Sequence, residues 1–372
     1  MKFIHIADVH LGATPDRDFP WGAERATEIW NTFSEVIEIA KQEKTDLLLV
    51  AGDLFHGQPL VRELKEVAYC FSQIPDTTVV LAAGNHDYLR RDSNYLTFSW
   101  PDNVVGLWTD TCEGVYLEKL NTYVYGMSYQ EREIREPVYN QTFPGGRINL
   151  KTEHPDAVHI LVAHGGDEKH IPIRHTALAG ADFDYIALGH IHKPEILVPG
   201  KMAYAGSLEP IDKNETGEHG YIKGIIRENQ NSAPGADSRS TEVTFVPASS
   251  REYKDMVLQV AAYSTRSSLL SRAKKYVKEH GEQHIYRITL NGFRDPDMDF
   301  SHMDFSSAGN VIEVRDETEP EYDFEEMKKK YAGTVIGCYL EKFPLEVPGL
   351  MTEVQRKALY YGVQALLGAR ED

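Results

Sequence analysis

The chain has 372 residues, a length that favours two domains. Of these residues 41% are hydrophobic and 26% charged, a composition typical of a globular protein. Its net charge of −18 argues against a protein that binds polyanions through an overall basic surface. No apolar run approaches the roughly 18 residues of a membrane span, and Met1–Asp8 turns polar too early for a signal peptide. With three scattered cysteines, these features predict a cytoplasmic protein without membrane attachment.

The negative charge is not spread evenly along the chain. Residues 1–245 carry 22 Lys and Arg against 36 Asp and Glu, whereas residues 246–372 carry 17 against 21. The net charges are therefore −14 and −4. Bound metal dications would offset part of the first value, so affinity for a polyanion is expected from the second part or from a partner.

Short runs of consecutive apolar residues recur through the first half, a pattern typical of strands buried on both faces. They are Phe3–Ile6, Leu47–Ala51, Val79–Ala82, Ile160–Ala163 and Tyr185–Leu188. Helices are predicted between the first three, at about Glu24–Lys44 and Val61–Ser72, and residues 104–127 resemble short strands without helices. This alternation predicts an α/β core with a mixed sheet.

A change in composition divides the chain. Residues 228–241 have the composition of a loop, a strand at Glu242–Val246 follows, and Pro247–Ser250 marks the predicted boundary. We therefore expect a domain at 1–246 and a small α/β module at 251–343. The module should contain strands at Met256–Ala261, Ile285–Leu290 and Val311–Val314 and a helix at Arg266–His280. A terminal segment, 344–372, should hold a helix at Leu350–Leu367.

Polar residues follow each of the five apolar runs. In chain order they are Asp8-Val9-His10, Gly52-Asp53-Leu54-Phe55-His56, Gly84-Asn85-His86-Asp87, His164-Gly165-Gly166 and Gly189-His190-Ile191-His192. Sites in α/β sheets form at the carboxyl ends of strands, so these side chains are expected to converge. Residues two apart in an extended segment project to the same side, which pairs Asp8 with His10 and His190 with His192.

Each motif alone has a simpler explanation. Asp-x-His arises by chance, and Gly-Asn-His-Asp is also what a turn requires. Chance does not explain all five in one chain, each directly after a hydrophobic run. The histidines outside this pattern are assigned structural roles, and they include His5, His154, His159, His170 and His175.

Together these motifs resemble the signature of the calcineurin-like metallophosphoesterase superfamily. The segment from Gly52 to His56 is similar to the branch of DNA double-strand-break repair nucleases, which includes the bacterial SbcD subunit and its archaeal and eukaryotic counterparts. Phosphoprotein phosphatases would instead show Gly-Asp-x-x-Asp-Arg. One position departs from many family members, because Tyr88 stands where a second Asp is common.

The resemblance implies a four-layer αββα sandwich, a capping domain at 251–343 and two metal ions, with manganese as the family's metal. By resemblance, Asp8, His10, Asp53 and His192 hold one ion, and Asp53, Asn85, His164 and His190 hold the other. His86 would protonate the leaving oxygen, His56 would steady the phosphate, and Asp87 would orient His86 or only shape the turn. Imidazole and carboxylate ligands also admit iron or zinc. Two ions about 4 Å apart suit an in-line displacement at phosphorus.

Three classes of function follow. The first is a DNA nuclease that works with an SbcC-like coiled-coil ATPase, the second a nucleotide or small-molecule phosphoesterase, and the third a non-catalytic scaffold. A scaffold should have lost ligands, and a small-molecule enzyme needs no module of this size after residue 250. A homodimer is left open.

Two helices in the second half are candidate binding surfaces. On the first, basic residues lie off the apolar stripe and either contact DNA or form a solvated face: Arg266, Arg272, Lys274, Lys275 and Lys278. On the second, Leu350, Val354, Ala358, Tyr361 and Leu366 recur at steps of three to five, after a capping box at Thr352-x-x-Gln355. This stripe either packs on the module or docks on the ATPase.

Overall fold

The computed structural model describes residues 1–143, 154, 156–228, 239–345 and 350–368. The chain divides into an N-terminal unit, Met1–Tyr253, and a C-terminal unit, Lys254–Asp372. Most of the loop-like segment predicted at 228–241 and the Pro348-Gly349 pair lie outside the described residues. None of the helices in the described ranges is long and apolar enough to cross a membrane.

Two sheets of six strands each form the frame of the N-terminal unit within the described residues. The first runs, in spatial order, β12 (Arg239–Pro247), β11 (Gly220–Glu228), β1 (Lys2–Ile6), β2 (Leu47–Ala51), β3 (Thr78–Ala82) and β4 (Val104–Gly106). The second runs β5 (Glu113–Leu117), β6 (Thr122–Gly126), β7 (Val158–His164), β8 (Tyr185–Gly189), β10 (Met202–Tyr204) and β9 (Glu195–Val198). Strands β1 to β4 pair in parallel, as do β6, β7, β8 and β10. The remaining pairs, β1–β11, β11–β12, β5–β6 and β9–β10, are antiparallel, so both sheets are mixed.

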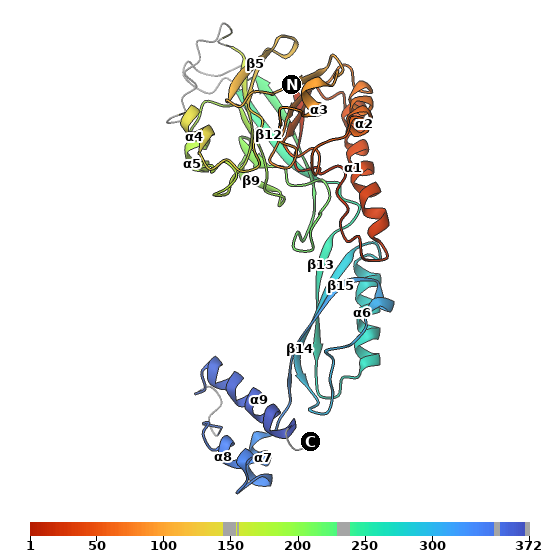
Figure 1. Ribbon diagram of the computed structural model, residues 1–372, viewed down its shortest axis with the longest axis vertical. Coiled ribbons are helices and arrows are strands. Elements are labelled where there is room, and N and C mark those ends of the chain that lie inside the picture. The colour runs from red at the N-terminus through yellow and green to blue at the C-terminus, as the bar shows by residue number, and fades with distance from the viewer. Residues whose placement is uncertain (144–153, 155, 229–238, 346–349, 369–372) are drawn as a thin grey trace. The chain divides into compact units, whose positions relative to one another are not determined.

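Helices cover the outer face of each sheet. They are α1 (Gly22–Glu43), α2 (Val61–Ser72), α3 (Asn94–Thr97), α4 (Val138–Thr142) and α5 (His175–Ala179), with a 3-10 turn at Glu118–Leu120. Figure 1 shows α1 and α2 on one flank of this unit and α4 and α5 on the other. The strands and helices predicted from the apolar runs are confirmed, most within two residues at each end.

The alternation of side chains along the strands explains the consecutive apolar runs. Leu48 and Val50 of β2 pack toward α1 and α2, whereas Leu47 and Leu49 of the same strand pack against the second sheet. A third cluster lies between the second sheet and the short helices. Apolar layers therefore separate helices, sheet, sheet and helices, which confirms the four-layer αββα fold.

The boundary between the units falls a few residues later than the sequence predicts. The Arg251 side chain pairs with Glu24 and Glu28 of α1, and the Tyr253 hydroxyl donates to Asp16 at 2.8 Å. These bonds attach residues 251–253 to the N-terminal unit. Composition could not reveal them, because their partners lie far earlier in the chain, on and just before α1.

A three-stranded sheet with one helix begins the C-terminal unit. Its strands are β13 (Tyr253–Val260), β14 (Ile285–Arg294) and β15 (Asn310–Pro320), of which β14 and β15 pair in parallel. Helix α6 (Arg266–His280) spans the predicted residues, begins at the N-cap Thr265, and buries Leu269, Ala273 and Val277 against the sheet. A 3-10 turn at Ser306–Ala308 precedes β15.

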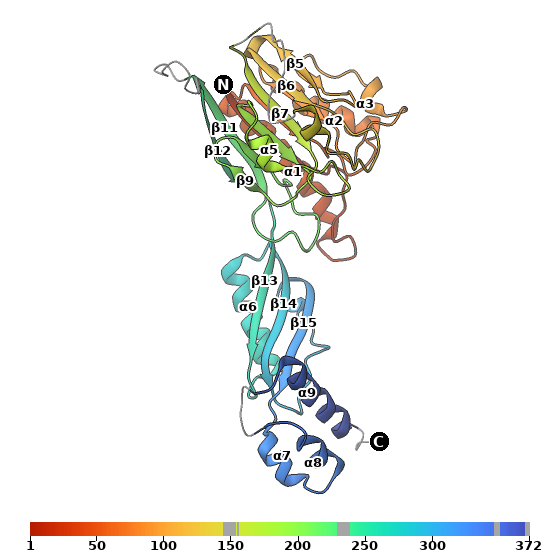
Figure 2. The same cartoon turned by 90° about the vertical axis from the view of Figure 1, so that its left-hand side faces the viewer.

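Three helices complete this unit and gather at one end of its sheet (Figure 2). They are α7 (Phe324–Lys330), α8 (Val335–Leu340) and α9 (Glu353–Gly368). The capping box before α9 is confirmed, since the Gln355 side chain accepts from the Thr352 amide and the Gln355 amide donates back to the Thr352 hydroxyl.

The structure shows that the last helix is buried through other residues than the predicted stripe. Leu359 and Val363 are the buried residues of α9, and they pack against Ile336 and Leu340 of α8. Of the predicted stripe, Leu350, Val354 and Tyr361 are instead exposed. The segment 344–372 is thus not set apart from the module, because α9 shares a core with α8. Periodicity alone could not choose between two apolar faces on one helix.

Candidate metal centre

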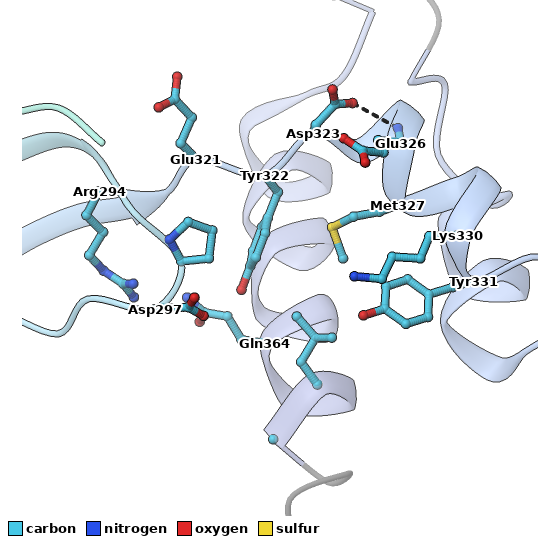
Figure 3. A pocket seen from close by; sticks show the side chains of 13 residues that line it. Arg294, Asp297, Glu321, Tyr322, Asp323, Glu326, Met327, Lys330, Tyr331 and Gln364 are labelled. Atoms are coloured by element: carbon cyan, nitrogen blue, oxygen red, sulfur yellow. Dashed lines mark hydrogen bonds between the residues drawn. The ribbon is translucent and has the colours of Figure 1, made fainter. Parts of the chain in front are cut away.

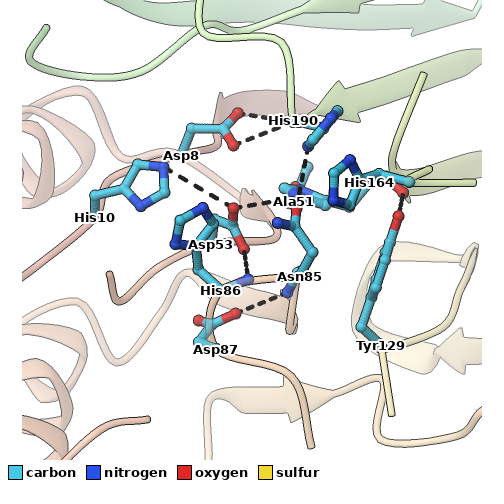
Figure 4. Close-up of polar contacts among 12 residues, drawn as sticks. Asp8, His10, Ala51, Asp53, Asn85, His86, Asp87, Tyr129, His164 and His190 are labelled. Atoms are coloured by element: carbon cyan, nitrogen blue, oxygen red, sulfur yellow. Dashed lines mark hydrogen bonds and ion pairs between the residues drawn. The ribbon is translucent and has the colours of Figure 1, made fainter. Parts of the chain in front are cut away.

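The five predicted motifs converge at the carboxyl ends of the strands. Asp8 and His10 follow β1, Asp53 follows β2, and Asn85 follows β3 of the first sheet. From the second sheet come His164, which ends β7, and the pair His190 and His192, which follow β8. Parallel strands bring their ends to one edge, and stacking the two sheets brings the two edges together (Figure 4).

One group of side chains surrounds a point between the two sheets. The Nε2 atoms of His10 and His192 lie 3.0 Å apart. His192 Nε2 is 3.9 Å from Asp8 Oδ1, and His10 Nε2 is 3.9 Å from Asp53 Oδ2. Two carboxylates and two imidazoles thus face one another at distances that leave room for one cation.

A second group meets on the other side of Asp53. His164 Nε2 lies 3.4 Å from Asp53 Oδ2 and 2.9 Å from Asn85 Oδ1. His190 Nδ1 lies 3.1 Å from the same Asn85 oxygen. Asp53 therefore takes part in both groups, which is the geometry a bridging carboxylate requires.

The hydrogen bonds on the outer side of the imidazoles fix which nitrogen faces inward. His164 donates Nδ1–H to the Ala51 carbonyl at 2.9 Å, so its Nε2 lone pair points at Asn85 and Asp53. His192 donates Nδ1–H to Glu215 at 2.8 Å, which leaves its Nε2 lone pair toward His10. Lone pairs that face one another repel unless a cation or an extra proton lies between them. The donor set therefore fits divalent metal ions.

The charges of these side chains point to the same conclusion. Burial alone would lower the pKa of His164 and His192, but the neighbouring carboxylates outweigh it and raise both to about 9. Asp53 is the main partner of His164, and Glu215 is that of His192. Burial raises the pKa of Asp8 to about 6. The buried carboxylates therefore stabilise positive charge next to them, either as protons on the imidazoles or as bound metal ions.

The backbone of these loops is strained where the ligands stand. Asp8, His10, Asp53 and His190 have φ angles of 49°, 52°, 50° and 96°, in a region that non-glycine residues rarely occupy. Such conformations cost on the order of 1–3 kcal/mol each and persist where the surrounding structure enforces them. Four of them in one ligand set indicate that the loops are shaped by the site and not by local preference.

Two glycines allow the loops to approach each other. A Cβ at Gly52, where φ is +89°, would lie 2.3 Å from His164 Nδ1. A Cβ at Gly84 would lie 2.2 Å from Asp53 Oδ1. Gly52 and Gly84 are therefore required for close packing against the predicted ligands, in addition to any role in a turn.

His56 and His86 lie on the solvent side of the first group. The nitrogens of His10, His56 and His86 come within 4.8 Å of one another, with His10 buried, His86 half-buried and His56 exposed. The His86 amide donates to Asp53 Oδ1 at 2.8 Å, and its Nδ1 lies 3.2 Å from the His56 carbonyl. The His86 ring is thus held beside the predicted ligands, and the His56 ring lies next to it, with its Nδ1 3.4 Å from His10 Nδ1.

Asp87 braces the loop and does not contact the His86 ring. Its carboxylate accepts from the amides of Gly84 and Phe55 and from the Tyr95 hydroxyl, at 2.8, 3.1 and 2.7 Å. The geometry favours the turn explanation of Asp87 over the orientation of His86. The aspartate links the loop after β3 to the loop after β2.

Sequence inspection missed several residues that support the ligands. Tyr129 donates its hydroxyl to the His164 carbonyl at 3.1 Å (Figure 4), and the Tyr139 hydroxyl accepts from the His164 amide at 3.2 Å. Asp167 and Glu215 hydrogen-bond to His190 and His192. None of the four stands in a strand-end motif, so no local pattern marks them.

The basic residues predicted on α6 are all exposed. Two of them hydrogen-bond within the module: Arg266 and Arg272 donate to the carbonyls of Asp299 and Gln259 at 2.8 and 2.6 Å. Lys275 lies 3.8 Å from Glu279. Lys274 and Lys278 are the remaining two of the five predicted basic residues, and both are exposed.

The C-terminal unit also contains an open pocket of about 740 Å³ (Figure 3). Acidic side chains, including Glu321 and Glu326, line it beside Arg294, Lys330 and Tyr331. Among the described residues, none of the predicted site residues contributes to this lining. The pocket is therefore unrelated to the metal centre.

A two-sheet sandwich that gathers carboxylate, amide and imidazole groups at one edge defines a metal-dependent phosphoesterase. Residues 1–194 match the calcineurin-like phosphoesterase family. The match covers more than half of the chain, and the chain belongs to this family.

Three similar proteins refine the comparison. The chain is 30% identical over 225 residues to the DNA double-strand break repair protein Mre11 of Methanocaldococcus jannaschii, covering 58% of each chain. It is 25% identical over 260 residues to the SbcD component of the SbcCD nuclease of Bacillus subtilis, covering 60% of this chain and 65% of the relative. It is 31% identical over 245 residues to an uncharacterized metallophosphoesterase, YhaO, of the same species, covering 59% and 56%. The alignments span less than two thirds of each relative.

Proposed function

We propose that this protein hydrolyses DNA phosphodiester bonds at a two-metal centre. The observation that carries the proposal is the pair of inward-facing groups that share Asp53. Asp8, His10, Asp53 and His192 would hold one ion. Asp53, Asn85, His164 and His190 would hold the other. We propose manganese as the metal, in line with the family resemblance.

Bound there, the ions would supply Lewis acidity that activates water and stabilises charge on the phosphate. The protein's own residues would do the rest. His86, half-buried and fixed through its amide to Asp53, would donate a proton to the leaving oxygen. His56, on the solvent side, would hydrogen-bond a non-bridging phosphate oxygen.

DNA is favoured as substrate because two of the relatives are named as a DNA repair protein and a nuclease component. A nucleotide or small-molecule phosphoesterase is the second candidate, and one relative carries only the name metallophosphoesterase. A non-catalytic scaffold is the third, and the retention of every predicted ligand counts against it.

The deciding experiment is a manganese-dependent digestion of linear duplex and single-stranded DNA beside nucleotide and aryl phosphates. We expect DNA to be cleaved and Asp53→Asn to be inactive on every substrate. Cleavage of the small phosphates alone would support the second candidate. Inactivity on all substrates despite bound metal would support the scaffold.

We also propose that the exposed face of α6 contacts DNA phosphates. The triple variant Lys274→Glu, Lys275→Glu and Lys278→Glu spares the two arginines that bond to the module. It should weaken DNA binding and flatten the dependence on salt by about one unit of log–log slope for each phosphate that is no longer bound. Hydrolysis of a small aryl phosphate should not change.

The control reverses three exposed lysines of the N-terminal unit, Lys41, Lys44 and Lys65. Both triple variants change the net charge equally, so only the position of the charges differs. An equal change in salt slope in both would show that α6 has no special role.

A coiled-coil ATPase of the SbcC type is the partner we propose, docked on the exposed side of α9. Val354 and Tyr361 are 78% and 69% exposed there, on the side opposite the buried Leu359 and Val363. An amphipathic partner helix would cover this apolar surface. Val354→Asp with Tyr361→Asp should abolish co-purification with the ATPase and leave the fold intact. Tyr69→Asp, at a tyrosine 64% exposed on α2, is the matched control.

A further inference from the structure

Two carboxylates outside the strand-end motifs bond to the two histidines that follow β8. Glu215, in the segment between β10 and β11, accepts from His192 Nδ1 at 2.8 Å. Asp167, three residues beyond His164, accepts from His190 Nε2 at 2.8 Å. Each histidine thus has one nitrogen on a carboxylate and the other facing the predicted ligands.

The two contacts select opposite ring nitrogens. His192 directs Nε2 inward, toward His10 and Asp8, whereas His190 directs Nδ1 inward, toward Asn85. The two residues lie only two positions apart and serve different groups. A neutral imidazole offers a lone pair on one nitrogen only, so the outer carboxylate decides which nitrogen can bind metal.

We infer that Asp167 and Glu215 are positioning residues, each of which sets the metal-binding tautomer of one histidine and thereby supports one of the two ions. The inference rests on the proposed two-metal centre. It implies that the ions can be weakened one at a time, although they share Asp53. Neither carboxylate contacts the reacting atoms, so both act through the histidines.

Glu215 is held on both of its oxygens. Oε1 accepts from His192, and Oε2 accepts from the Ile211 amide at 2.9 Å. A glutamine has an acceptor oxygen in place of one carboxylate oxygen and a donor NH₂ group in place of the other, so it cannot accept at both positions. Either the Ile211 amide loses its partner, or His192 must turn its Nε2 proton toward the ion. The Glu215 side chain is 17% exposed, so water compensates little for the loss.

Asp167 accepts more hydrogen bonds than Glu215 does, and its side chain is more exposed to solvent. Oδ1 accepts from the amides of Lys169 and His170 at 2.7 and 2.9 Å. Oδ2 accepts from His170 Nδ1 at 2.9 Å as well as from His190. With 47% of the side chain exposed, water can take over part of the bond to His190. We therefore expect a smaller effect from Asp167→Asn than from Glu215→Gln.

The test is a titration of the full-length protein with Mn²⁺, followed by calorimetry and by electron paramagnetic resonance, which separates a coupled ion pair from a single ion. Wild type should bind two ions and show the coupled spectrum. Glu215→Gln should weaken one ion by about 10–100-fold, the range for loss of such an outer contact. The spectrum should then show a single ion at manganese concentrations that give the pair in wild type. Asp167→Asn should do the same to the other ion with a smaller shift, and the double variant should weaken both.

Matched controls remove the same charge from the same loops. Glu218→Gln and Glu168→Gln lie three and one positions away from the two carboxylates and are exposed. Their manganese affinities should equal that of wild type. Circular dichroism of the metal-free variants checks folding, and Asp167→Asn provides the test on a separate loop if Glu215→Gln fails to fold.

Affinities that match the control variants would overturn the inference, as would the loss of both ions together in either single variant. Two manganese ions on wild type without DNA cleavage would contradict the proposed function and leave the inference standing. If the wild-type protein binds fewer than two manganese ions, both the proposed two-metal function and the inference on Asp167 and Glu215 are wrong.

Discussion

The strand-end edge of the N-terminal unit and the helical end of the C-terminal unit differ in how they use apolar packing. At the edge, three apolar clusters fix the strands, and the predicted ligands Asp8, His10 and Asp53 are at most 1% exposed. At the helical end, one cluster with four buried residues holds α8 and α9 together, and Val354 and Tyr361 remain outside it. At the strand-end edge the fold itself buries the apolar and polar side chains, whereas α9 leaves apolar side chains exposed.

The roles proposed for the two surfaces account for the difference. A metal ligand must be held within a fraction of an ångström, so its loop is buried and even strained. A docking face must stay open until its partner arrives, and exposed apolar area then contributes to association. The comparison predicts that mutations at the edge change chemistry first, whereas mutations at the helical end change stability or binding first.

The largest effect is expected from Asp53→Asn. Asp53 faces both groups of ligands, and an amide cannot bridge two cations as a carboxylate does. Metal content and DNA hydrolysis should be lost together, which metal analysis and the digestion assay measure. Asp76→Asn, at an exposed aspartate of the same unit, should behave as wild type. Retention of two ions in Asp53→Asn would show that Asp53 is not the bridge.

His86→Gln should separate chemistry from metal binding. Only its amide, and not its ring, contacts Asp53, so the ions should stay while turnover falls by roughly 10²–10⁴-fold, as for a lost general acid. Steady-state kinetics and metal analysis on one preparation measure both quantities. Unchanged turnover, or loss of metal, would contradict the role given to His86.

Leu359→Ala should affect the helical end alone. Leu359 is fully buried against α8, and a leucine-to-alanine change in a core costs about 2–5 kcal/mol. Hydrogen exchange should show faster opening of α7, α8 and α9, with manganese affinity unchanged. Val354→Ala, on the exposed side of α9, should leave exchange unaltered. Deletion of residues 345–372 would remove Leu359 and Val363 as well, so it tests packing and docking together.

A pH dependence of stability is also expected within the N-terminal unit. His5 is fully buried on β1, its Nδ1 lies 3.0 Å from the Tyr185 hydroxyl, and burial lowers its pKa to about 3. The unfolded chain takes up this proton near pH 6.5, while the folded chain does so only near pH 3. His5 therefore costs stability as pH falls through this window, by up to about 1.4 kcal/mol per pH unit.

Urea unfolding of wild type and His5→Asn between about pH 8 and pH 4 measures this contribution. Asparagine keeps a polar group near the Nδ1 position and does not titrate. The variant should lose less stability than wild type on acidification, and the difference at the alkaline end should reflect packing alone. Identical slopes would show that His5 does not contribute.

Sequence alone was enough to predict which side chains meet at the strand ends. A carboxylate or imidazole directly after a run such as Leu47–Ala51 is a local signal, because a strand buried on both faces must be apolar and must end where its side chains meet solvent. The helix predicted at about Arg266–His280 is confirmed with these bounds, and the structure shows that Thr265 caps its start and Gly281 follows its end. The order of the motifs also carried the family resemblance, which the family match bears out.

Only the tertiary structure decided which groups stand behind the ligands and which face of α9 is buried. Glu215 reaches His192 from 23 positions away, and Asp167 reaches His190 from the same separation, so no spacing rule marks either contact. Both faces of α9 are apolar, and the choice of Leu359 over Val354 depends on where α8 lies. Local sequence determines what a strand end offers, whereas the packing of distant segments determines what each side chain meets.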